Sequence, residues 1–444
     1  MGEWLWRDSC GLFGIHGDIS SRVRREFKFD EPRDAGVGAN RKGNKDPHAY
    51  LTYLGLHALQ HRGQESAGIV TAQDGSLYVH KGLGHVADVF TPQLIERMPG
   101  KLAIGHVRYS TAGKKILFKD AQPFVMEYTR GGFAVAHNGN ITNAYELREE
   151  LEQEGAVFHT TSDTEIITHL VARAKKNDPI ENLIWALTKL RGAFSLVILT
   201  EGLLIGVRDP NGFRPLVLGR IDNASVIASE SCAFGLIKAE FVREIEPGEM
   251  IVVGPEGHKM LMSIRPFKRT SPTPCIFEFI YFARPDSVIF GQNVYQVRLK
   301  FGRRLAEEHP ADADLVFGIP DSGVPAAIGY SEASGLPFQF GMIRSHYIGR
   351  TFIEPLPHMR HFAVRLKLNP ISDVVKGKKV VVVDDSIVRA TTIRRIVKMI
   401  RQAGAEEIHI RISSPPIRFP CFYGIDTPTK MELIASTHTV DEIR

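Results

Sequence analysis

The chain has 444 residues, of which 43% are apolar and 24% are charged, and it carries a formal net charge of +5 at pH 7. This composition excludes a largely disordered chain and predicts about two or three globular domains. The charge excess suits anionic phosphate substrates and is too small for a nucleic-acid-binding protein. Since no apolar run reaches the roughly eighteen residues of a membrane span, we expect a cytoplasmic protein with neither a membrane nor a nucleic-acid partner.

The N-terminal residues precede a candidate nucleophile. Residues 1–9 have the features of neither a targeting signal nor a folded element, and we interpret them as a cleavable leader. Cys10 then begins a short apolar strand, Cys-Gly-Leu-Phe-Gly-Ile. A cysteine at a newly exposed N-terminus has its own α-amine, with an ordinary pKa of about 8, which can act as its general base. The alternative is that Cys10 is a small buried hydrophobe without chemistry.

Two polar stretches further along are suited to holding a polar substrate. Arg108 in HVRYSTAG follows a predicted strand, Leu102–Val107, and its planar guanidinium can grip an α-carboxylate through two hydrogen bonds. In HNGN, Asn138 and the backbone of Gly139 follow a predicted strand, 132–136, and can donate the two hydrogen bonds of an oxyanion hole. Each stretch alone also fits a turn with a capped end.

Several motifs resemble, in order and spacing, the glutaminase domain of the N-terminal-nucleophile amidotransferases. They are CGLFGIHG, HALQHRGQESAGI, GHVRYSTAG, HNGN and SDTEI. The resemblance implies a four-layer αββα sandwich, with Cys10 as the nucleophile and with Asn138 and Gly139 as the oxyanion hole. Asp163 alone also fits a cap of the helix that follows it. The resemblance instead makes it a ligand of glutamine, together with Arg62, Arg108 and Thr111.

One segment, Ser20–Lys45, departs from this resemblance. It is basic, rich in Gly and Asn, and without apolar periodicity, so we predict an exposed, mobile insertion rather than a binding surface. The first domain is predicted to end near Pro266, where a basic, proline-rich linker begins. The predicted domains are therefore 10–265 and 266–444, and Cys232 is interpreted as a structural residue of the first.

The second predicted domain begins with two turns of interest. A predicted helix, Val294–Glu308, leads into a predicted strand, Leu315–Ile319, and then into the turn PDSGVPAA. A strand, a small-residue turn and a helix form an anion cradle, although a plain βα turn has the same pattern. After the predicted strand Phe338–Ile343, basic and aromatic residues crowd into one stretch. That stretch fits either a solvated loop or a loop that closes over a substrate.

The segment Val380–Thr392 combines a run of valines, two acids and a hydroxyl-rich turn. Four β-branched residues in a row fit a strand buried on both faces of a parallel sheet, and the apolar period that follows fits a helix. Asp384 and Asp385 thus lie at the carboxyl end of the strand, where open α/β sheets bind ligands. The turn suits a phosphate, and the acids suit magnesium or ribose hydroxyls. The alternative is a pair of acids that cap a strand, but the chain contains neither a P-loop nor a dinucleotide fingerprint.

The motif VVVVDDSIVRATT resembles that of the type I phosphoribosyltransferases. The resemblance implies a parallel-sheet domain in which the two aspartates hold the ribose hydroxyls of phosphoribosyl pyrophosphate and the next loop holds its 5-phosphate. Ala390 replaces the usual glycine, and it can donate its N–H only if the loop needs no positive φ there. Mg²⁺ is implied at Ser322, Asp384 and Asp385. The other implied ligands of phosphoribosyl pyrophosphate are Asp321, Arg344, Tyr347, Arg350, Lys367, Ser386, Arg389, Ala390, Thr391 and Thr392.

The two halves in this order resemble a family of enzymes that transfer the amide nitrogen of glutamine to phosphoribosyl pyrophosphate. The expected products are 5-phosphoribosylamine, glutamate and pyrophosphate, in the first committed step of purine synthesis. The family also implies a homo-oligomer, a dimer or a tetramer, and feedback inhibition by purine nucleotides. The alternatives are another glutamine amidotransferase with the same first domain, and an inactive or regulatory homologue that binds purine nucleotides.

Two cysteines, Cys275 and Cys421, have contexts that resemble those of [4Fe–4S] ligands in the leader-bearing branch of this family. The other two ligands of that cluster form a C-x-x-C in a C-terminal extension, which is not found before Arg444, where the sequence stops. Three interpretations follow: a truncated cluster protein, which we favour, a site completed by another ligand or subunit, or a lost cluster.

Overall fold

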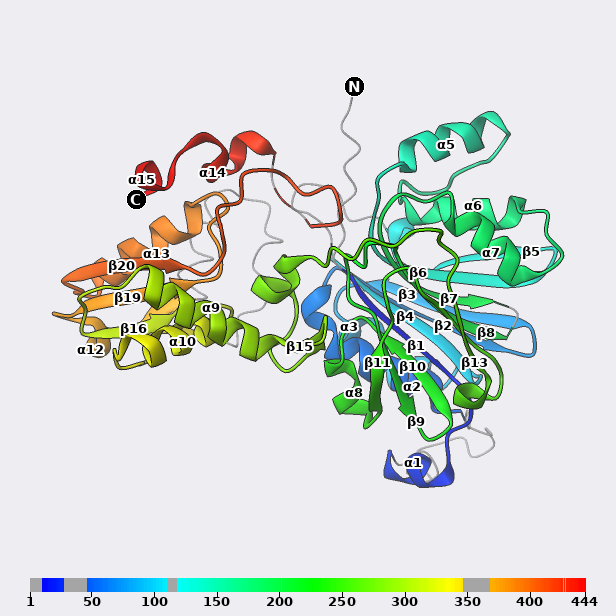
Figure 1. The fold of residues 1–444 in the computed structure, drawn as a ribbon. Coiled ribbons are helices and arrows are strands. Elements are labelled where there is room, and N and C mark those ends of the chain that lie inside the picture. The colour runs from blue at the N-terminus through cyan, green and yellow to red at the C-terminus, as the bar shows by residue number, and fades with distance from the viewer. Residues whose placement is uncertain are drawn as a thin grey trace. The chain divides into compact units, whose positions relative to one another are not determined.

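The computed structural model describes residues 10–27, 46–109, 118–200, 202–345, 368–425, 427 and 429–444. They form two compact units (Figure 1). The first contains the described residues of Met1–Cys275, Ser287–Gly291 and Cys421–Asp426, and the second contains those of Ile276–Asp286, Gln292–Pro420 and Thr427–Arg444. The domain limits predicted from the sequence, 1–9, 10–265 and 266–444, stay predictions.

The first unit contains two antiparallel sheets. In both sheets, some hydrogen-bonded neighbours are strands that do not follow each other along the chain. One sheet has the order β11 (Glu240–Glu244), β9 (Val217–Ile221), β10 (Ala224–Ala228), β1 (Gly11–His16), β4 (Leu102–Arg108), β2 (Ser66–Gln73) and β3 (Ser76–Leu83). The other has the order β13 (Leu261–Ile264), β12 (Met250–Val253), β8 (Leu203–Arg208), β7 (Gly192–Thr200), β6 (Gly131–Ile141) and β5 (Phe124–Tyr128).

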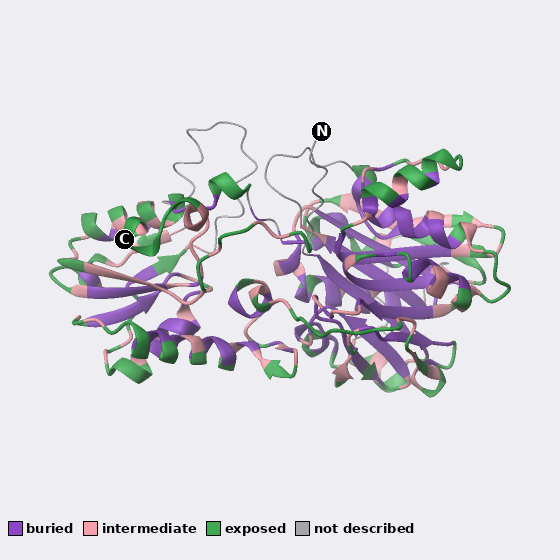
Figure 2. Ribbon diagram, turned by 45° about the horizontal axis from the view of Figure 1, so that its top comes forward, coloured by how far each residue is buried: buried purple, intermediate pink, exposed green. Residues whose placement is uncertain are grey.

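Three hydrophobic cores separate four layers in this unit. Along β6, Ala134 and Ala136 belong to the core between the two sheets, whereas Val135 packs on the outer side against helices. This alternation has the period of two expected of a strand that contacts a different layer on each face. The first sheet has its own outer core, which includes Phe13 and Ala49. Figure 2 shows the strands of this unit largely buried, and the predicted αββα sandwich is confirmed.

Helices cover both outer faces of the sandwich. Those of the first sheet's side are α1 (Ser21–Glu26), α2 (His48–Ala58), α3 (Val86–Val89), α4 (Pro92–Ile95) and α8 (Cys232–Ile237). The other side is covered by α5 (Ala144–Gln153), α6 (Thr164–Arg173) and α7 (Pro179–Leu187). Short 3₁₀ turns are η1 (Gln60–Arg62), η2 (Phe118–Asp120) and η3 (Gly257–Met260).

The interpretation of Ser20–Lys45 as an exposed, mobile insertion is wrong for its first residues, which include helix α1. Its beginning is helical, and Val23 and Phe27 pack, partly buried, against the outer core of the first sheet. Apolar residues four apart lie on one face of a helix. The apolar contact was missed because the segment contains too few apolar residues to show a period. Residues 28–45 lie outside the described residues, so their predicted mobility stays a prediction.

The second unit is built on a parallel sheet of order β16 (Leu315–Gly318), β19 (Lys379–Asp384) and β20 (Glu407–Ile412). Val380 and Val382 belong to the core on one face, and Val381 and Val383 to the core on the other. The valine run is therefore buried on both faces, as its composition predicts. The parallel-sheet fold class predicted for this part of the chain is confirmed.

Helices flank this sheet and bring both predicted turns to its carboxyl edge. They are α9 (Val294–Glu308), α10 (Val324–Ser334), α12 (Ser372–Val375) and α13 (Thr391–Gln402). Further elements are the π-turn η4 (Glu278–Phe282), β14 (Val288–Ile289), β15 (Gln292–Asn293), β17 (Met342–Arg344), β18 (Leu368–Pro370), η6 (Lys430–Glu432), α14 (Ile434–Thr437) and α15 (Val440–Ile443).

One predicted strand, Phe338–Ile343, is wrong in its limits. Phe338 makes only an isolated bridge to Val316, and β17 begins at Met342 and pairs with β18 instead. Aromatic and apolar residues alone do not fix where a chain leaves one sheet for another. Among the described ranges, no helix has the length and apolar character needed to cross a bilayer.

Candidate functional sites

The predicted nucleophile lies at the start of β1, in the interior of the first unit. Cys10 is completely buried, and its backbone nitrogen donates to Oδ1 of Asn138 at 3.1 Å. Asn138 comes from β6 of the other sheet, so the two sheets meet at this point. The Nδ2 of Asn138 is buried and has no hydrogen-bond partner among the described residues. A buried donor without a partner is costly, and it is the kind of group that an oxyanion hole requires.

The residue after Asn138 must be glycine for reasons of space and backbone conformation. Gly139 has a φ of +147°, and a Cβ built on it would lie 2.1 Å from the carbonyl oxygen of Ala193 in β7. No side chain fits at that distance. The predicted pair of oxyanion donors thus lies on a strand whose path is fixed by its neighbour, which keeps the donors rigid.

Asp163 contacts the same strand, β6, at its last residue. Its Oδ2 accepts from the backbone nitrogen of Ile141 at 2.9 Å, and its Oδ1 lies 3.7 Å from Nδ1 of His137. Burial alone would raise the pKa of Asp163, but His137 and these hydrogen bonds hold that pKa below its usual range. Although Asp163 precedes α6, its side chain makes no capping hydrogen bond. The helix-cap alternative is therefore wrong, and the carboxylate stays ionised, as its predicted role as a ligand of glutamine requires.

Arg108 and Arg62, two of the other predicted glutamine ligands, both donate hydrogen bonds to backbone carbonyl oxygens. Arg108, at the end of β4, is half-buried, and its Nη1 donates to the carbonyl oxygen of Asp120 at 2.7 Å. Arg62 is 1% exposed and donates from Nε to the carbonyl oxygen of Cys10 at 3.0 Å. Arg62 thus contacts the nucleophile's backbone, as the resemblance implies, and its predicted role as a ligand of glutamine stays a prediction. Thr111 lies outside the described residues.

A buried carboxylate, Glu230, was missed by sequence reasoning. It pairs with Arg62 through Nη1 and Oε1 at 2.5 Å, and it is completely buried. Burial alone would raise the pKa of Glu230, but its neighbours His61 and Arg62 and the hydrogen bonds that it accepts hold that pKa well below its usual range. The only signal in the sequence is an acid inside the small and apolar stretch ASESCAFG.

In the second unit, the two aspartates meet the first predicted turn. Asp385 is 7% exposed; its Oδ1 accepts from Oγ of Ser322 at 2.5 Å, and its Oδ2 accepts from Oγ of Ser386 at 2.6 Å. Gly323 makes this approach close, because a Cβ there would lie 2.4 Å from the carbonyl oxygen of Val383. The turn after β16 and the turn after β19 therefore form one polar site at the carboxyl edge of the sheet.

The electrostatics of this site favour a cation. Burial and then the charge of Asp385 raise the pKa of Asp384 well above its usual range. Two adjacent carboxylates that repel each other gain most from a divalent cation or from ribose hydroxyls that donate to them. With the Ser322 hydroxyl, the donor set consists of oxygens only, which is what Mg²⁺ prefers. The residues present therefore fit the magnesium site implied by the resemblance.

The turn that was predicted to hold a phosphate ends in a strained alanine. Ala390, just before α13, has a φ of +59°, which is the left-handed region. We expected that alanine could replace glycine here only if the loop needs no positive φ. The loop does have a positive φ at this position. The preceding residues contact the C-terminal segment: Ile434 donates from its nitrogen to the carbonyl oxygen of Val388 at 3.0 Å, and Arg389 pairs with Glu432 at 3.1 Å. The predicted phosphate ligand Arg389 thus has a surface partner in this structure.

We expect Ala390→Gly to stabilise the protein by about 0.5–1 kcal/mol. The left-handed conformation costs alanine roughly 1–2 kcal/mol, and the greater freedom of glycine in the unfolded chain cancels part of this gain. Equilibrium urea unfolding measures the change. Ala403→Gly is the matched control, because Ala403 ends the same helix at a φ of −75°, where glycine has the entropic penalty and loses a methyl group that packs, partly buried, against the core. Equal losses of stability in both variants would contradict the strain at Ala390.

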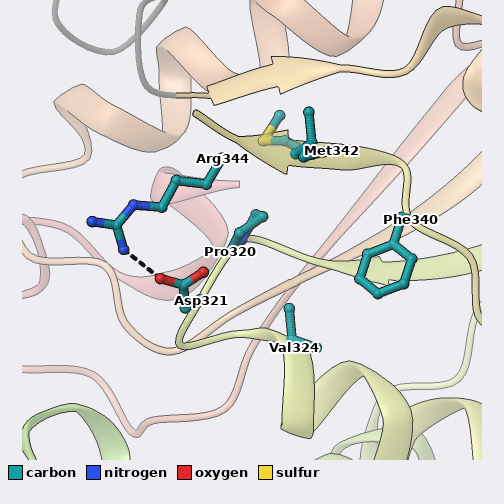
Figure 3. A pocket seen from close by; sticks show the side chains of 7 residues that line it. Pro320, Asp321, Val324, Phe340, Met342 and Arg344 are labelled. Atoms are coloured by element: carbon teal, nitrogen blue, oxygen red, sulfur yellow. Dashed lines mark hydrogen bonds and ion pairs between the residues drawn. The ribbon is translucent and has the colours of Figure 1, made fainter. Parts of the chain in front are cut away.

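A cavity of about 260 Å³ lies beside the first turn of this unit (Figure 3). Asp321 and Arg344 form an ion pair on one side of it, and both were predicted as ligands of phosphoribosyl pyrophosphate. The remaining lining is apolar and consists of Pro320, Val324, Phe340, Met342 and Ile343. The predicted ligands Tyr347, Arg350 and Lys367 lie outside the described residues. Thr391 and Thr392 begin α13 beside the phosphate turn.

The two predicted cluster cysteines lie beside one aromatic pair of the first unit. Phe213 and Tyr423 stack with ring centroids 4.3 Å apart. Cys275 donates from its backbone nitrogen to the carbonyl oxygen of Phe213 at 3.2 Å, and Sγ of Cys421 accepts from the nitrogen of Tyr423 at 3.2 Å. Both thiols are half-buried. Two thiolates are half of the set that a [4Fe–4S] cluster needs, so the described residues alone do not fit that cluster.

Comparison with known proteins gives matches over nearly the whole chain. Residues 106–235 match a glutamine amidotransferase domain, and residues 295–413 match a phosphoribosyl transferase domain. The chain is 49% identical to the chloroplastic amidophosphoribosyltransferase 2 of Arabidopsis thaliana, over 99% of this chain and 73% of that protein. It is 50% identical to the amidophosphoribosyltransferase of Bacillus subtilis, over 89% of this chain and 82% of that protein.

Solved structures agree with these matches. One, described as the allosteric regulatory enzyme of purine biosynthesis, has a TM-score of 0.87 and 46% identity, and covers 98% of this chain and 87% of that chain. Another is the glutamine phosphoribosylpyrophosphate amidotransferase of B. subtilis complexed with ADP and GMP. It has a TM-score of 0.86 and 45% identity, over 98% of this chain and 88% of that one.

Proposed function

The chain belongs to the amidophosphoribosyltransferase family, and from that membership we propose how its residues divide the reaction. The enzyme transfers the amide nitrogen of glutamine to phosphoribosyl pyrophosphate, and it is a pentosyltransferase with a glutamine amidotransferase domain. Glutamine hydrolysis belongs to the first unit and phosphoribosyl transfer to the second. The alternative of a different glutamine amidotransferase is not favoured, because the second unit matches a phosphoribosyl transferase domain.

In the first unit, the Cys10 thiol attacks the side-chain amide carbon of glutamine. The amide oxygen becomes an oxyanion, which accepts hydrogen bonds from Nδ2 of Asn138 and the backbone of Gly139. The α-amine of Cys10 takes the thiol proton and passes it to the leaving ammonia, and water then hydrolyses the glutamyl thioester to glutamate. The buried, unpaired Nδ2 of Asn138 is the observation that carries this assignment. Arg108, Thr111 and Asp163 hold the α-carboxylate and amino group of glutamine, and Arg62 holds the backbone of Cys10.

The base of this step requires removal of the leader, residues 1–9. The Cys10 nitrogen already donates to Oδ1 of Asn138, so the amine released by cleavage keeps a partner that holds it beside the thiol. An intact-mass measurement of the mature protein tests this proposal. A protein that hydrolyses glutamine while residues 1–9 remain attached would contradict it, because its Cys10 nitrogen is an amide without basic character.

In the second unit, Asp384 and Asp385 hold the ribose hydroxyls, and the turn from Ser386 to Thr392 holds the 5-phosphate. Asp321 and Arg344 are proposed as ligands of the pyrophosphate, and Tyr347, Arg350 and Lys367 stay predicted ligands of phosphoribosyl pyrophosphate. Ammonia attacks C1 of the ribose, the bond from C1 to the pyrophosphate oxygen breaks, and 5-phosphoribosylamine forms. Magnesium, when bound at Ser322, Asp384 and Asp385, offsets negative charge on the pyrophosphate.

Inhibitors, assembly, a metal cluster and location are also proposed for this chain. Purine nucleotides are proposed as feedback inhibitors, since the solved B. subtilis relative is complexed with ADP and GMP. A homo-oligomer, a [4Fe–4S] cluster at Cys275 and Cys421, and a place in the leader-bearing branch stay predictions. Cytoplasmic location also stays a prediction, because relatives include proteins named chloroplastic. Iron and sulfide analysis after anaerobic purification tests the cluster.

The function is tested by following phosphoribosylamine and pyrophosphate from phosphoribosyl pyrophosphate and Mg²⁺, with either glutamine or ammonium chloride as the nitrogen source. We expect product from both sources. Product from neither would contradict the enzyme and favour the alternative of an inactive purine-nucleotide-binding homologue. Product from ammonium chloride alone would contradict the glutamine step only.

A further inference from the structure

Glu230 is a fully buried carboxylate for which the reaction described above has no use. It lies between β10 and α8, and each of its oxygens accepts from two side chains. Oε1 accepts from His61 Nε2 at 2.8 Å and from Arg62 Nη1 at 2.5 Å. Oε2 accepts from Ser287 Oγ at 2.6 Å and contacts the thiol of Cys232 at 3.7 Å. A carboxylate with this many donors is ionised and fixed in orientation.

The Arg62 guanidinium connects this carboxylate to the nucleophile. Its Nη1 donates to Glu230, and its Nε donates to the carbonyl oxygen of Cys10 at 3.0 Å. Because the guanidinium is planar and rigid, fixing one of these bonds fixes the direction of the other. The position of the Cys10 carbonyl, and with it the backbone from which the thiol extends, therefore depends on Glu230.

Neighbours of Glu230 hold the same stretch of backbone. Leu12 donates from its nitrogen to Oγ of Ser229 at 2.9 Å, and the nitrogen of Ser229 donates to the carbonyl oxygen of Leu12 at 3.0 Å. On the opposite side, Val288 donates from its nitrogen to Oγ of Ser231 at 2.7 Å. The turn 229–231 thus joins the nucleophile's strand to the segment that begins at Ser287.

A metal site is the other interpretation of this cluster. Ligand atoms of His61, Glu230 and Cys232 lie within 4.8 Å of one another. However, the Arg62 guanidinium contacts Oε1 of the same carboxylate and supplies a full positive charge there. A cation would have to displace or tolerate that charge, so the hydrogen-bonded network is the better interpretation.

We propose that Glu230 is a positioning residue for Cys10, acting through Arg62, and that Ser287 fixes its second oxygen. This inference rests on the proposed role of Cys10 as the nucleophile. Thiol attack depends steeply on the placement of the sulfur relative to the amide carbon. Loss of the Glu230 charge removes the anion that pairs with Arg62, and the donor to the carbonyl oxygen of Cys10 is then no longer fixed in direction. Glutamine binding, which uses Arg108 and Asp163, is not affected directly.

The test is Glu230→Gln in the full-length protein, measured with glutamine and with ammonium chloride as nitrogen sources. We expect kcat with glutamine to fall about 10- to 100-fold, while KM for glutamine changes less than about two-fold. The rate with ammonium chloride uses the second unit only and shows whether the variant is folded. Ser287→Ala keeps the ion pair and removes one donor, so we expect a smaller fall of about three- to ten-fold.

Glu249→Gln is the matched control in the same unit. Glu249 is 1% exposed and pairs with Arg243, with 2.6 Å between Nη2 and Oε1, but it has no link to Cys10. We expect this variant to lose melting temperature as Glu230→Gln does and to keep kcat with glutamine. Equal kcat values for the two variants would overturn the proposal and leave Glu230 a structural residue. A rise in KM alone, or an equal fall with both nitrogen sources, would also overturn it.

A second readout separates this proposal from the proposed function. The rate of Cys10 alkylation by iodoacetamide, followed by mass spectrometry of the N-terminal peptide, does not require turnover. If the wild-type protein makes no phosphoribosylamine, the proposed function fails, and alkylation still tests the positioning of the thiol. We expect alkylation of Cys10 to change in Glu230→Gln and not in Glu249→Gln. Identical alkylation rates in all three proteins would contradict the positioning role.

Discussion

Cys10→Ala is expected to abolish product formation from glutamine and to leave product formation from ammonium chloride intact. In the proposed mechanism the thiol makes the covalent bond to the glutamyl group, and alanine has no group that can replace it, so we expect a loss of at least about 10³-fold. The second unit receives ammonia from solution instead and does not contain this residue. Both rates are measured by phosphoribosylamine formation at saturating phosphoribosyl pyrophosphate.

The ammonium chloride rate is the internal control for folding in this experiment. Cys10 is completely buried, and replacing a thiol by a methyl group leaves only a small cavity in its place. A variant that retained the glutamine rate would show that another residue is the nucleophile. Parallel loss of both rates would instead show that Cys10 supports the whole fold, which is the alternative interpretation of a buried cysteine.

Both predicted fold classes were correct, but they rest on different signals: the αββα sandwich was implied by the resemblance of motifs, whereas the buried strand of the parallel sheet follows from a pattern that burial imposes. Four consecutive valines require a strand covered on both faces, and Val380 to Val383 alternate between two cores. In the first unit, strand β6 is longer than its predicted range 132–136 and includes the whole HNGN motif. The residues of β6 beyond position 136 were missed because most of them are polar, and a strand is predicted from the alternation of apolar residues.

The sequence allowed a contact within a candidate site to be expected where both of its residues belong to one motif. Asp385 and Ser386 are adjacent in the sequence and bonded in the structure. The link from Glu230 through Arg62 to Cys10 joins residues 52 and 168 positions apart. Such links depend on how sheets stack, which local patterns do not encode. The ion pair of Asp321 with Arg344 is a similar case, since each was predicted to bind substrate and neither was predicted to bind the other.

Asp384→Asn is expected to abolish phosphoribosylamine formation from both nitrogen sources and to stabilise the folded protein. Asparagine cannot supply the negative charge that ribose hydroxyls and magnesium require, so we expect a fall in kcat/KM of about 10²- to 10³-fold. Glutamine hydrolysis, which occurs in the first unit, should persist. Asp373→Asn is the control for the loss of a carboxylate, because Asp373 is exposed and lies in α12 of the same unit.

The gain in stability follows from the sign of the pKa shift. Burial and the charge of Asp385 raise the pKa of Asp384 in the folded protein, whereas its pKa in the unfolded chain is about 4. As pH rises above that value, the unfolded chain loses a proton that the folded protein keeps, so wild-type stability falls. Asparagine has no proton to lose, and the advantage of the variant in melting temperature should therefore grow as the pH rises above about 4. A constant or shrinking advantage would contradict the raised pKa. A growing one, together with lost activity, would show that the site keeps the Asp384 carboxyl beside Asp385 at the expense of stability because the reaction needs it.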